Sequence, residues 1–354
     1  MMNRIISYTQ AIQEATDQSM EKDKSVFVIG LGTTYPQACD GTVGNLSNKY
    51  PGRIFDMPCS ENAATGFCIG SALTGLKPIL VHGRNEFAFF GFDQIATQAA
   101  KWNYMFGGGN PIPLVIRISI GRRWGDAPQH TSALQSIYGA IPGLKVVIPS
   151  TPRSAKGLLM SAIQDNNPVI CLEHRWLYNI FESVPEEPYF QPLDKCEIVR
   201  EGYSITIIAN SDMLIESLKC VPILKENNID PEIIDLVSIN PIDHETIIKS
   251  IEKTGILLVV DSGNISFGIG REIIGKVKEN IETWRLLNII NLATPNCPCP
   301  MSSVLTEAYY PTAKAIIEAI SKMFKIDMKY DKQLDFNQLH LPQKEDIDKL
   351  KEGL

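Results

Sequence analysis

The chain has 354 residues, of which 44% are hydrophobic and 21% are charged, and its formal net charge is -7 at pH 7. This length exceeds what one small core organises, so the sequence predicts two domains of about 150 residues each. The acidic balance argues against nucleic acid or an anionic membrane as partner, and no apolar run reaches the roughly 18 residues of a membrane span.

Eight cysteines are scattered along the chain, and the N-terminal stretch is amphipathic, without a continuous apolar core. Such a stretch is unlike a signal peptide, so we expect a cytoplasmic protein with reduced thiols. Cys297 and Cys299 come close together in NCPCP. Metal binding by this pair is a minor alternative, because two prolines make a compact metal loop awkward.

The first half of the chain alternates strands with helices. After an amphipathic helix over 5–20, apolar runs predict strands at 25–30, 78–81, 113–118, 145–149 and 168–173, with helices over 62–73, 92–104 and 154–165. These strands are apolar on both faces, which is typical of a parallel sheet covered by helices. The GLGTTY segment after the first strand gives only weak support to a dinucleotide site, because the third glycine is missing.

The helix predicted over 62–73 consists of small and apolar residues, which indicates burial on several sides. Ser60 stands at the N-cap position, and Glu61 falls in the first turn at the edge of an apolar interior. On the residues alone, Glu61 either complements the helix dipole or acts as a chemical reagent. The polar loop GRRWGDAPQHTSA, which holds His130, is a second candidate for function.

A proline-rich acidic stretch around 182–194 indicates a crossing between domains. We assign residues 1–185 to the first domain, 186–200 to a linker and 201–326 to a smaller α/β domain, followed by a charged tail, 327–354, that drapes or frays. The second domain has predicted strands near 204–210, 232–237, 256–261 and 285–290, with helices from about 212, 243, 268 and 311.

The segment GIGREIIG, Gly268 to Gly275, follows one of these strands and opens a helix. It either holds an anion on free N–H groups or permits close packing of the helix, and packing is the favoured interpretation.

Long segments of the chain resemble the beta subunits of thiamine-diphosphate-dependent 2-oxo-acid dehydrogenases of the pyruvate and branched-chain types. These are relatives of the pyrimidine-binding and C-terminal domains of transketolase. The most specific segments are FDMPCSENAATGFCIGSALTGLKPI, FGFDQIATQAAKWNYMFGG and QHTSALQSIYGAIPGLKVVIPSTPRSAKGLL, and their order and spacing also match. The resemblance covers about residues 4–325. It implies an α/β fold with a parallel-sheet pyrimidine-binding domain followed by a smaller transketolase C-terminal-type domain.

The same resemblance implies roles for four residues near the cofactor. Glu61 would hydrogen-bond N1′ of the aminopyrimidine and so promote loss of the thiazolium C2 proton, with small residues around it excluding water. Phe87 matches the aromatic ring that stacks on the pyrimidine, the alternative being a core phenylalanine. Gly83 replaces a bulky apolar residue near the thiazolium, which implies a roomier pocket. His130 matches an active-site histidine near the substrate carboxylate or acyl acceptor, the alternative being an inert loop histidine.

A monovalent-cation site is also implied. The residues that resemble it would bind K⁺ mainly through backbone carbonyls, and they are Leu114, Ala162, Ile163, Asp165 and Asn167. The alternative is an ordinary helix C-terminus.

Other positions depart from the family and bear on the substrate. Leu31 and Gly32 stand where the family usually has an acidic pair, and Arg122 and Arg123 occupy the loop before His130. These arginines either bind an anionic substrate or form a solvated contact between subunits.

The superfamily binds magnesium and diphosphate through GDG followed by an asparagine, and this chain lacks that motif. The resemblance therefore implies an alpha subunit that holds Mg²⁺ and the diphosphate half of thiamine diphosphate, with two alpha and two beta subunits in the assembly. A lipoyl acyltransferase core is a further partner of such enzymes. The expected function is decarboxylation of a 2-oxo acid with transfer of the acyl unit. The alternatives are a split transketolase-like ketol transferase acting on a sugar or phosphorylated substrate, and a non-catalytic assembly subunit.

Overall fold

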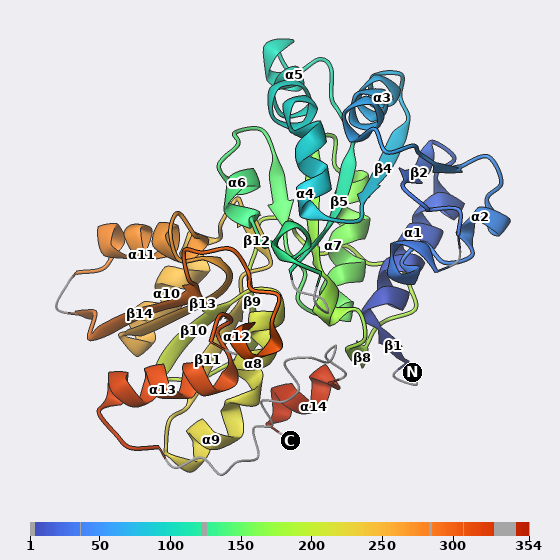
Figure 1. The fold of residues 1–354 in the computed structure, drawn as a ribbon. Helices are drawn as coiled ribbons and strands as arrows, with labels where there is room; N and C mark the ends of the chain where they lie inside the picture. The colour runs from blue at the N-terminus through green and yellow to red at the C-terminus, as the bar shows by residue number, and fades with distance from the viewer. Residues whose placement is uncertain are drawn as a thin grey trace.

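A computed structural model describes residues 4–35, 37–121, 126–282, 285–306, 308–328 and 345–353. In this part of the chain, two α/β units lie side by side, each built on one mainly parallel sheet (Figure 1). The strand order is β12-β6-β7-β5-β4-β2-β3 in the first sheet and β14-β13-β10-β11-β9 in the second, and β1 pairs separately with β8. None of the helices in the described ranges has both the length and the apolar composition required to cross a membrane.

The first sheet accounts for the apolar runs of the N-terminal half. Its parallel strands are β2 (Val26–Gly30), β3 (Ile54–Asp56), β4 (Lys77–His82), β5 (Val115–Ile120), β6 (Lys145–Val147) and β7 (Val169–His174). Strands β2, β5 and β7 are buried along their whole length. Because helices cover both faces, apolar residues occupy successive positions, and the predicted parallel sheet is confirmed.

Two long helices pack together on one face of this sheet, α1 (Tyr8–Lys22) and α7 (Pro152–Gln164) (Figure 1). Each begins with a capping box, from Ser7 and from Thr151. The helix predicted from residue 5 begins only at Tyr8, because β1 (Ile5–Ser7) pairs with β8 (Phe181–Ser183).

The other face is covered by α3 (Glu61–Leu73) and by the π-helical turn η3 (Gln94–Ala99), which continues into α5 (Ala100–Met105). Short elements connect these parts: η1 (Ala38–Gly41), α2 (Leu46–Lys49), α4 (Asn85–Ala88), η2 (Phe89–Gly91), η4 (Pro128–His130), α6 (Gln135–Gly139) and η5 (Arg175–Leu177).

The second unit repeats the alternation on a smaller scale. Its strands are β9 (Glu197–Arg200), β10 (Ile205–Ala209), β11 (Pro231–Asp235), β13 (Ile256–Asn264) and β14 (Asn288–Thr294). Its helices are α8 (Asp212–Lys219), α9 (Val221–Glu226), α10 (His244–Thr254), α11 (Ile269–Asn280), α12 (Ser303–Thr306) and α13 (Ala313–Phe324). All strand pairs are parallel except that of the edge strand β9.

The two units interlock. Strand β12 (Ser238–Asn240) comes from the second half of the chain but pairs antiparallel with β6 at the edge of the first sheet. The Ser150 hydroxyl donates to Asp235 at 2.7 Å, and Gln135 donates to Asp261 at 2.6 Å, so buried hydrogen bonds also join the units. The predicted division near residue 186 therefore gives the order of the units along the chain, but not the composition of each sheet.

The end of the charged tail packs against both units, where Lys219 of α8 pairs with Glu345 at 2.9 Å. Helix α14 (Ile347–Glu352) lies beside β8, where the Ser183 N–H donates to Asp348 at 2.8 Å and Lys351 donates to Glu182 at 2.8 Å. Residues 345–353 thus drape over the junction of the two units, which is one of the two outcomes that the sequence left open.

Candidate active site

Glu61 lies in the first turn of α3, as predicted, and its side chain is half-buried. Ser60 is at the N-cap position, but its hydroxyl contacts Asn62 and does not cap a backbone N–H. Gly91 lies so close that a Cβ there would be 3.2 Å from the Glu61 carbonyl, so α3 begins directly against the turn that follows α4. The Glu61 carboxylate has no hydrogen bond or ion pair with any other described residue.

The expected burial of α3 on several sides is wrong for this chain by itself. One face is buried through Ala64, Thr65, Cys68, Ile69 and Ala72. The opposite face carries Ala63, Phe67 and Gly70 and is exposed, with Phe67 at 57%. Small residues of this chain therefore do not close off water around Glu61. The composition of a helix cannot distinguish burial inside one chain from burial against a second chain.

Phe87 and His130 come together from separate segments. Their ring centroids are 5.5 Å apart in an edge-on arrangement. Phe89 and Phe92 pack against the first core beside Tyr138, whereas Phe87 is half-exposed and is not part of that cluster. This arrangement argues against the core alternative for Phe87.

The His130 ring has a defined orientation. Its Nδ1 lies 2.8 Å from the backbone carbonyl of Asp126. Because a carbonyl oxygen can only accept, Nδ1 carries the proton of the neutral ring and Nε2 keeps its lone pair. His130 can therefore accept or donate a proton at Nε2.

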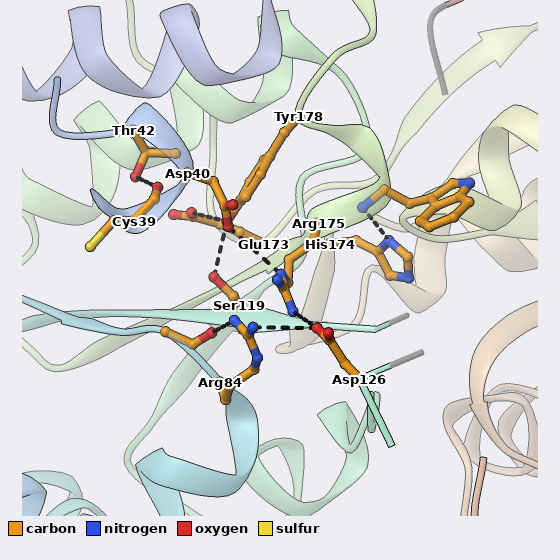
Figure 2. A network of polar contacts seen from close by, with 12 residues as sticks. Cys39, Asp40, Thr42, Arg84, Ser119, Asp126, Glu173, His174, Arg175 and Tyr178 are labelled. Atoms are coloured by element: carbon orange, nitrogen blue, oxygen red, sulfur yellow. Dashed lines mark hydrogen bonds and ion pairs between the residues drawn. The ribbon is translucent and has the colours of Figure 1, made fainter. Parts of the chain in front are cut away.

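A chain of alternating charges supports this loop, and Figure 2 shows it. The Asp126 carboxylate accepts from Arg84 at 3.3 Å and from Arg175 at 3.0 Å, and Arg175 also lies 3.7 Å from Asp40. Arg84 follows β4 and Arg175 follows β7, so the loop is held to the carboxyl ends of two strands. The arrangement fixes Asp126, whose carbonyl in turn orients His130.

A fully buried ion pair lies within the sheet near this network. Arg117 on β5 forms two hydrogen bonds to Glu173 on β7, at 2.5 and 2.9 Å, and Tyr178 donates to the same carboxylate at 3.3 Å. Burial alone would lower the pKa of Arg117, but the Glu173 carboxylate raises it above its usual value. Such a bidentate pair holds the strands below the site in one arrangement.

Gly83 lies at the end of β4, between His82 and Arg84. A Cβ at this position would meet no atom within 4 Å, so packing within the chain does not require the glycine. The roomier pocket at this position remains a prediction. Arg122 and Arg123 lie outside the described residues.

The residues of the predicted cation site lie near the end of α7. The Asp165 carboxylate accepts from the Asn167 N–H at 2.9 Å and pairs with Lys145. The carbonyls of Leu114 and Ala162 accept from Val169 and Asp165, and Ile163 is buried in the helix. The described contacts are those of an ordinary helix end, and they leave K⁺ binding a prediction.

The contacts at the start of α11 distinguish between anion binding and close packing for the GIGREIIG segment. The buried carboxylate of Asp261 accepts from the Gly263 N–H at 3.0 Å, and the Ile269 N–H also stabilises its charged form. Asp261 therefore already occupies the first N–H of the helix, which a bound anion would use. A Cβ added at Gly270 would lie only 2.3 Å from the Asn291 side chain, so the glycine is needed for close packing. This supports the packing interpretation.

Sequence reasoning missed Arg84, Asp126 and Arg175. A signal for the two arginines was present, because Arg84 comes two residues after the end of β4 and Arg175 comes directly after β7. The carboxyl ends of parallel strands meet at one edge of a sheet, so charged residues there belong to one neighbourhood.

Comparisons with known proteins agree with this architecture. The family model "Transketolase, pyrimidine binding domain" matches residues 4–180, and "Transketolase, C-terminal domain" matches residues 194–316. The chain is 38% identical over 325 residues to a pyruvate dehydrogenase E1 component subunit beta of Porphyra purpurea, covering 91% of this chain and 97% of that protein.

It is also 37% identical over 334 residues to an acetoin:2,6-dichlorophenolindophenol oxidoreductase subunit beta of Cupriavidus necator, covering 92% and 99%. A solved structure of a split gene transketolase, described as an inactive beta4 tetramer, superposes with a TM-score of 0.75 at 18% identity, covering 91% of this chain and 99% of that one. At that identity the superposition shows a shared fold.

Proposed function

This chain belongs to the transketolase-like family of 2-oxo-acid dehydrogenase beta subunits, and from this premise we propose that it is half of a thiamine-diphosphate-dependent enzyme. The enzyme decarboxylates a 2-oxo acid and transfers the acyl unit, and it is active only with an alpha subunit. Relatives named as beta subunits of pyruvate dehydrogenase E1 and of an acetoin oxidoreductase span nearly the whole chain, which supports this assignment.

The observation that carries the proposal is the Glu61 carboxylate. It is half-buried at the start of an apolar helix and has no partner among the described residues. Water still reaches this carboxylate in the chain alone, and a second chain packed on α3 would remove that water. A ligand that supplies a hydrogen bond would then offset the cost of burying the carboxylate. Glu61 therefore fits the aminopyrimidine of thiamine diphosphate, which when bound supplies an acidic thiazolium C2 for attack on the keto carbon.

The residues around Glu61 suit the same half of the cofactor. In the proposal, Glu61 holds a proton at N1′ of the pyrimidine, and Phe87 offers a half-exposed neutral ring to its flat face. Gly83 leaves space near the thiazolium without loss of packing in the chain.

His130 is proposed to move a proton near the substrate carboxylate or the acyl acceptor. Its free Nε2 supports this role, since the Asp126 carbonyl occupies Nδ1. Arg84 lies near His130, but its guanidinium already pairs with the Asp126 carboxylate.

The remaining half of the site is assigned to the alpha subunit. The chain has no GDG motif, so Mg²⁺ and the diphosphate would be held by that partner. The exposed apolar face of α3, together with Tyr104, Met105 and Phe106 at the end of α5, supports burial against a second chain. Two alpha and two beta subunits, with a lipoyl acyltransferase core as acyl acceptor, complete the proposal.

Two finer elements belong to the same proposal. One is a K⁺ ion bound by backbone carbonyls around Leu114 and residues 162–167. The Asp165 carboxylate pairs with Lys145, so the carbonyls would be the ligands. The other is a cytoplasmic location, which is supported by eight cysteines that are all free.

The test is co-expression of the chain with the alpha subunit encoded beside it, followed by assay with thiamine diphosphate and Mg²⁺. Reduction of 2,6-dichlorophenolindophenol should depend on both chains and on a 2-oxo acid. The same assay with pyruvate, branched 2-oxo acids and sugar phosphates compares kcat/KM across donors. Absence of turnover with every donor, in an assembled complex that binds the cofactor, would favour the assembly-subunit alternative.

A further inference from the structure

A cavity lies between the two units, and Glu61, Phe87 and His130 do not line it. Its volume is about 330 Å³, which is at the small end of ligand sites. One wall comes from the first unit, through Pro128 and residues 131–134. The other wall comes from the second unit, through Ser262, Asn264, Thr294, residues 296–299, Tyr309 and Tyr310.

The lining of this cavity is polar but uncharged. No aspartate, glutamate, lysine, arginine or histidine is among its lining residues. Its polar members carry hydroxyl, amide or thiol groups: Thr131, Ser132, Ser262, Asn264, Thr294, Asn296, Cys297, Cys299, Tyr309 and Tyr310. An anionic ligand would lose its hydration there without gaining an opposite charge.

The hydrogen bonds within the lining determine which polar groups remain as donors or acceptors for a ligand. Thr131 donates to the Ala127 carbonyl at 3.1 Å, Thr294 to Gly263 at 2.9 Å, and Tyr309 to Cys297 at 3.2 Å. Because a carbonyl can only accept, these hydroxyl hydrogens are committed to the protein.

The hydroxyl oxygens keep lone pairs. The Tyr309 and Thr294 hydroxyls also interact with each other, and the lone pairs that remain can accept hydrogen bonds from a ligand. Asn264 also donates, to the Pro295 carbonyl at 3.2 Å, and so keeps its own carbonyl oxygen as an acceptor. The wall is therefore richer in acceptors than in free donors.

We propose that this cavity binds a small uncharged polyhydroxy compound, whose hydroxyl groups donate to these acceptors. Ser132 and Asn296 add groups that can donate or accept, which suits a ligand whose hydroxyls do both. The proposal needs no cofactor and does not rest on the proposed function. A ligand in the cavity would nevertheless contact Pro128 and Thr131, which flank His130.

Cys297 provides a direct readout. It is exposed and lines the cavity, whereas Cys59 is exposed and does not line it. The full-length chain is treated with iodoacetamide, and the alkylation rates of Cys297 and Cys59 are measured by peptide mass spectrometry. The uncharged probes are ribitol and myo-inositol, and the matched anionic probes are gluconate and ribose 5-phosphate. An uncharged probe should slow Cys297 alkylation at least about threefold in a saturable manner and leave Cys59 unchanged.

A single hydroxyl tests the direction of the hydrogen bonds. Tyr309→Phe keeps the ring but removes an acceptor, so the probe concentration that gives half protection should rise about three- to tenfold. Tyr203→Phe, at a tyrosine that is 71% exposed and does not line the cavity, is the matched control and should change nothing.

Three results would overturn the proposal. One is protection by gluconate or ribose 5-phosphate equal to that by ribitol. The second is absence of protection by both uncharged probes up to about 100 mM, a range that includes the weakest specific binding. The third is an equal effect of Tyr309→Phe and Tyr203→Phe, with melting temperatures establishing that both variants fold.

Discussion

Glu61 is a half-buried carboxylate in the first turn of an apolar helix, and it has no partner among the described residues. A carboxylate that only complements the helix dipole contributes about 0.3–1 kcal/mol, and its amide analogue would cost little more than that. A carboxylate that holds a proton at the cofactor contributes to the reaction itself. The two roles therefore predict different effects of a Glu61 substitution on activity, but similar and small effects on stability.

Glu61→Gln should lower the rate of hydrogen–deuterium exchange at cofactor C2 in the assembled enzyme by about 10²–10⁴-fold. The amide is nearly isosteric, but it cannot share a proton with N1′ as a carboxylate does. Proton NMR of the C2 position measures the rate. Asn62→Ala, at the exposed neighbouring position, is the control and should leave exchange unchanged. Unaltered exchange in the glutamine variant, with the complex intact, would return Glu61 to a capping role.

Asp235 is a second carboxylate with an unusual environment, at the junction of the two units. Burial raises its pKa from 3.8 to about 7, against the hydrogen bond donated by Ser150. Between these values the folded chain keeps a proton that the unfolded chain has released. Stability should therefore fall as the pH rises through this window, and the loss should be complete above pH 7.

Asp235→Asn resembles the protonated side chain at every pH and so should remove this dependence. The free energy of unfolding of the variant, relative to wild type, should rise by roughly 2–4 kcal/mol between pH 4 and pH 8. Urea unfolding at a series of pH values measures the difference. A difference that is constant across the series would contradict the raised pKa.

Helix α3 and the end of α5 both carry exposed apolar side chains, and the two helices lie at the same end of the first unit (Figure 1). In α3, Gly70 is helical and exposed, and a Cβ there would meet no atom within 4 Å. Glycine inside a helix costs about 0.5–1 kcal/mol relative to alanine, and nothing in the described chain requires it. The glycine is explained if a second chain approaches α3 closely.

Gly70→Ala should therefore stabilise the isolated chain by about 0.5–1 kcal/mol but weaken its assembly with the alpha subunit. Gly275→Ala is the matched control, because Gly275 is also helical and exposed with no atom within 4 Å of an added Cβ, but it lies on α11 of the second unit. It should stabilise the chain and leave assembly unchanged. Thermal unfolding and analytical ultracentrifugation measure the two quantities. Equal assembly by both variants would argue against α3 as the contact.

The predicted strands and long helices largely agree with the structure, because their apolar periodicity is set by local burial. Strand β1 and the π-helical turn η3 were not predicted. Ile5–Ser7 is extended only because it pairs with β8, about 175 residues later in the chain. Such pairing overrides the helical pattern that continues from Tyr8, and local sequence contains no sign of it.

At the scale of the molecule, the order of two α/β units was predictable, but their interlocking was not. Strand β12 belongs to the first sheet, and Gln135 reaches across to Asp261, so the units share both a sheet and buried hydrogen bonds. The fold and the family followed from long matching segments. In the network of Arg84, Asp126 and Arg175, the two arginines could have been noticed because each comes just after a buried strand. The place of Asp126 could not, because it lies in a loop and meets them only in the folded chain.

The central claim is that this chain holds only the pyrimidine half of a cofactor site, and titration calorimetry with thiamine diphosphate and Mg²⁺ tests it most directly. The isolated chain should bind weakly, at least about 100-fold more weakly than the complex with its alpha subunit, since it lacks groups for the charged diphosphate. Glu61→Gln in the complex checks that binding uses this chain. Micromolar binding by the isolated chain would contradict a site divided between two subunits.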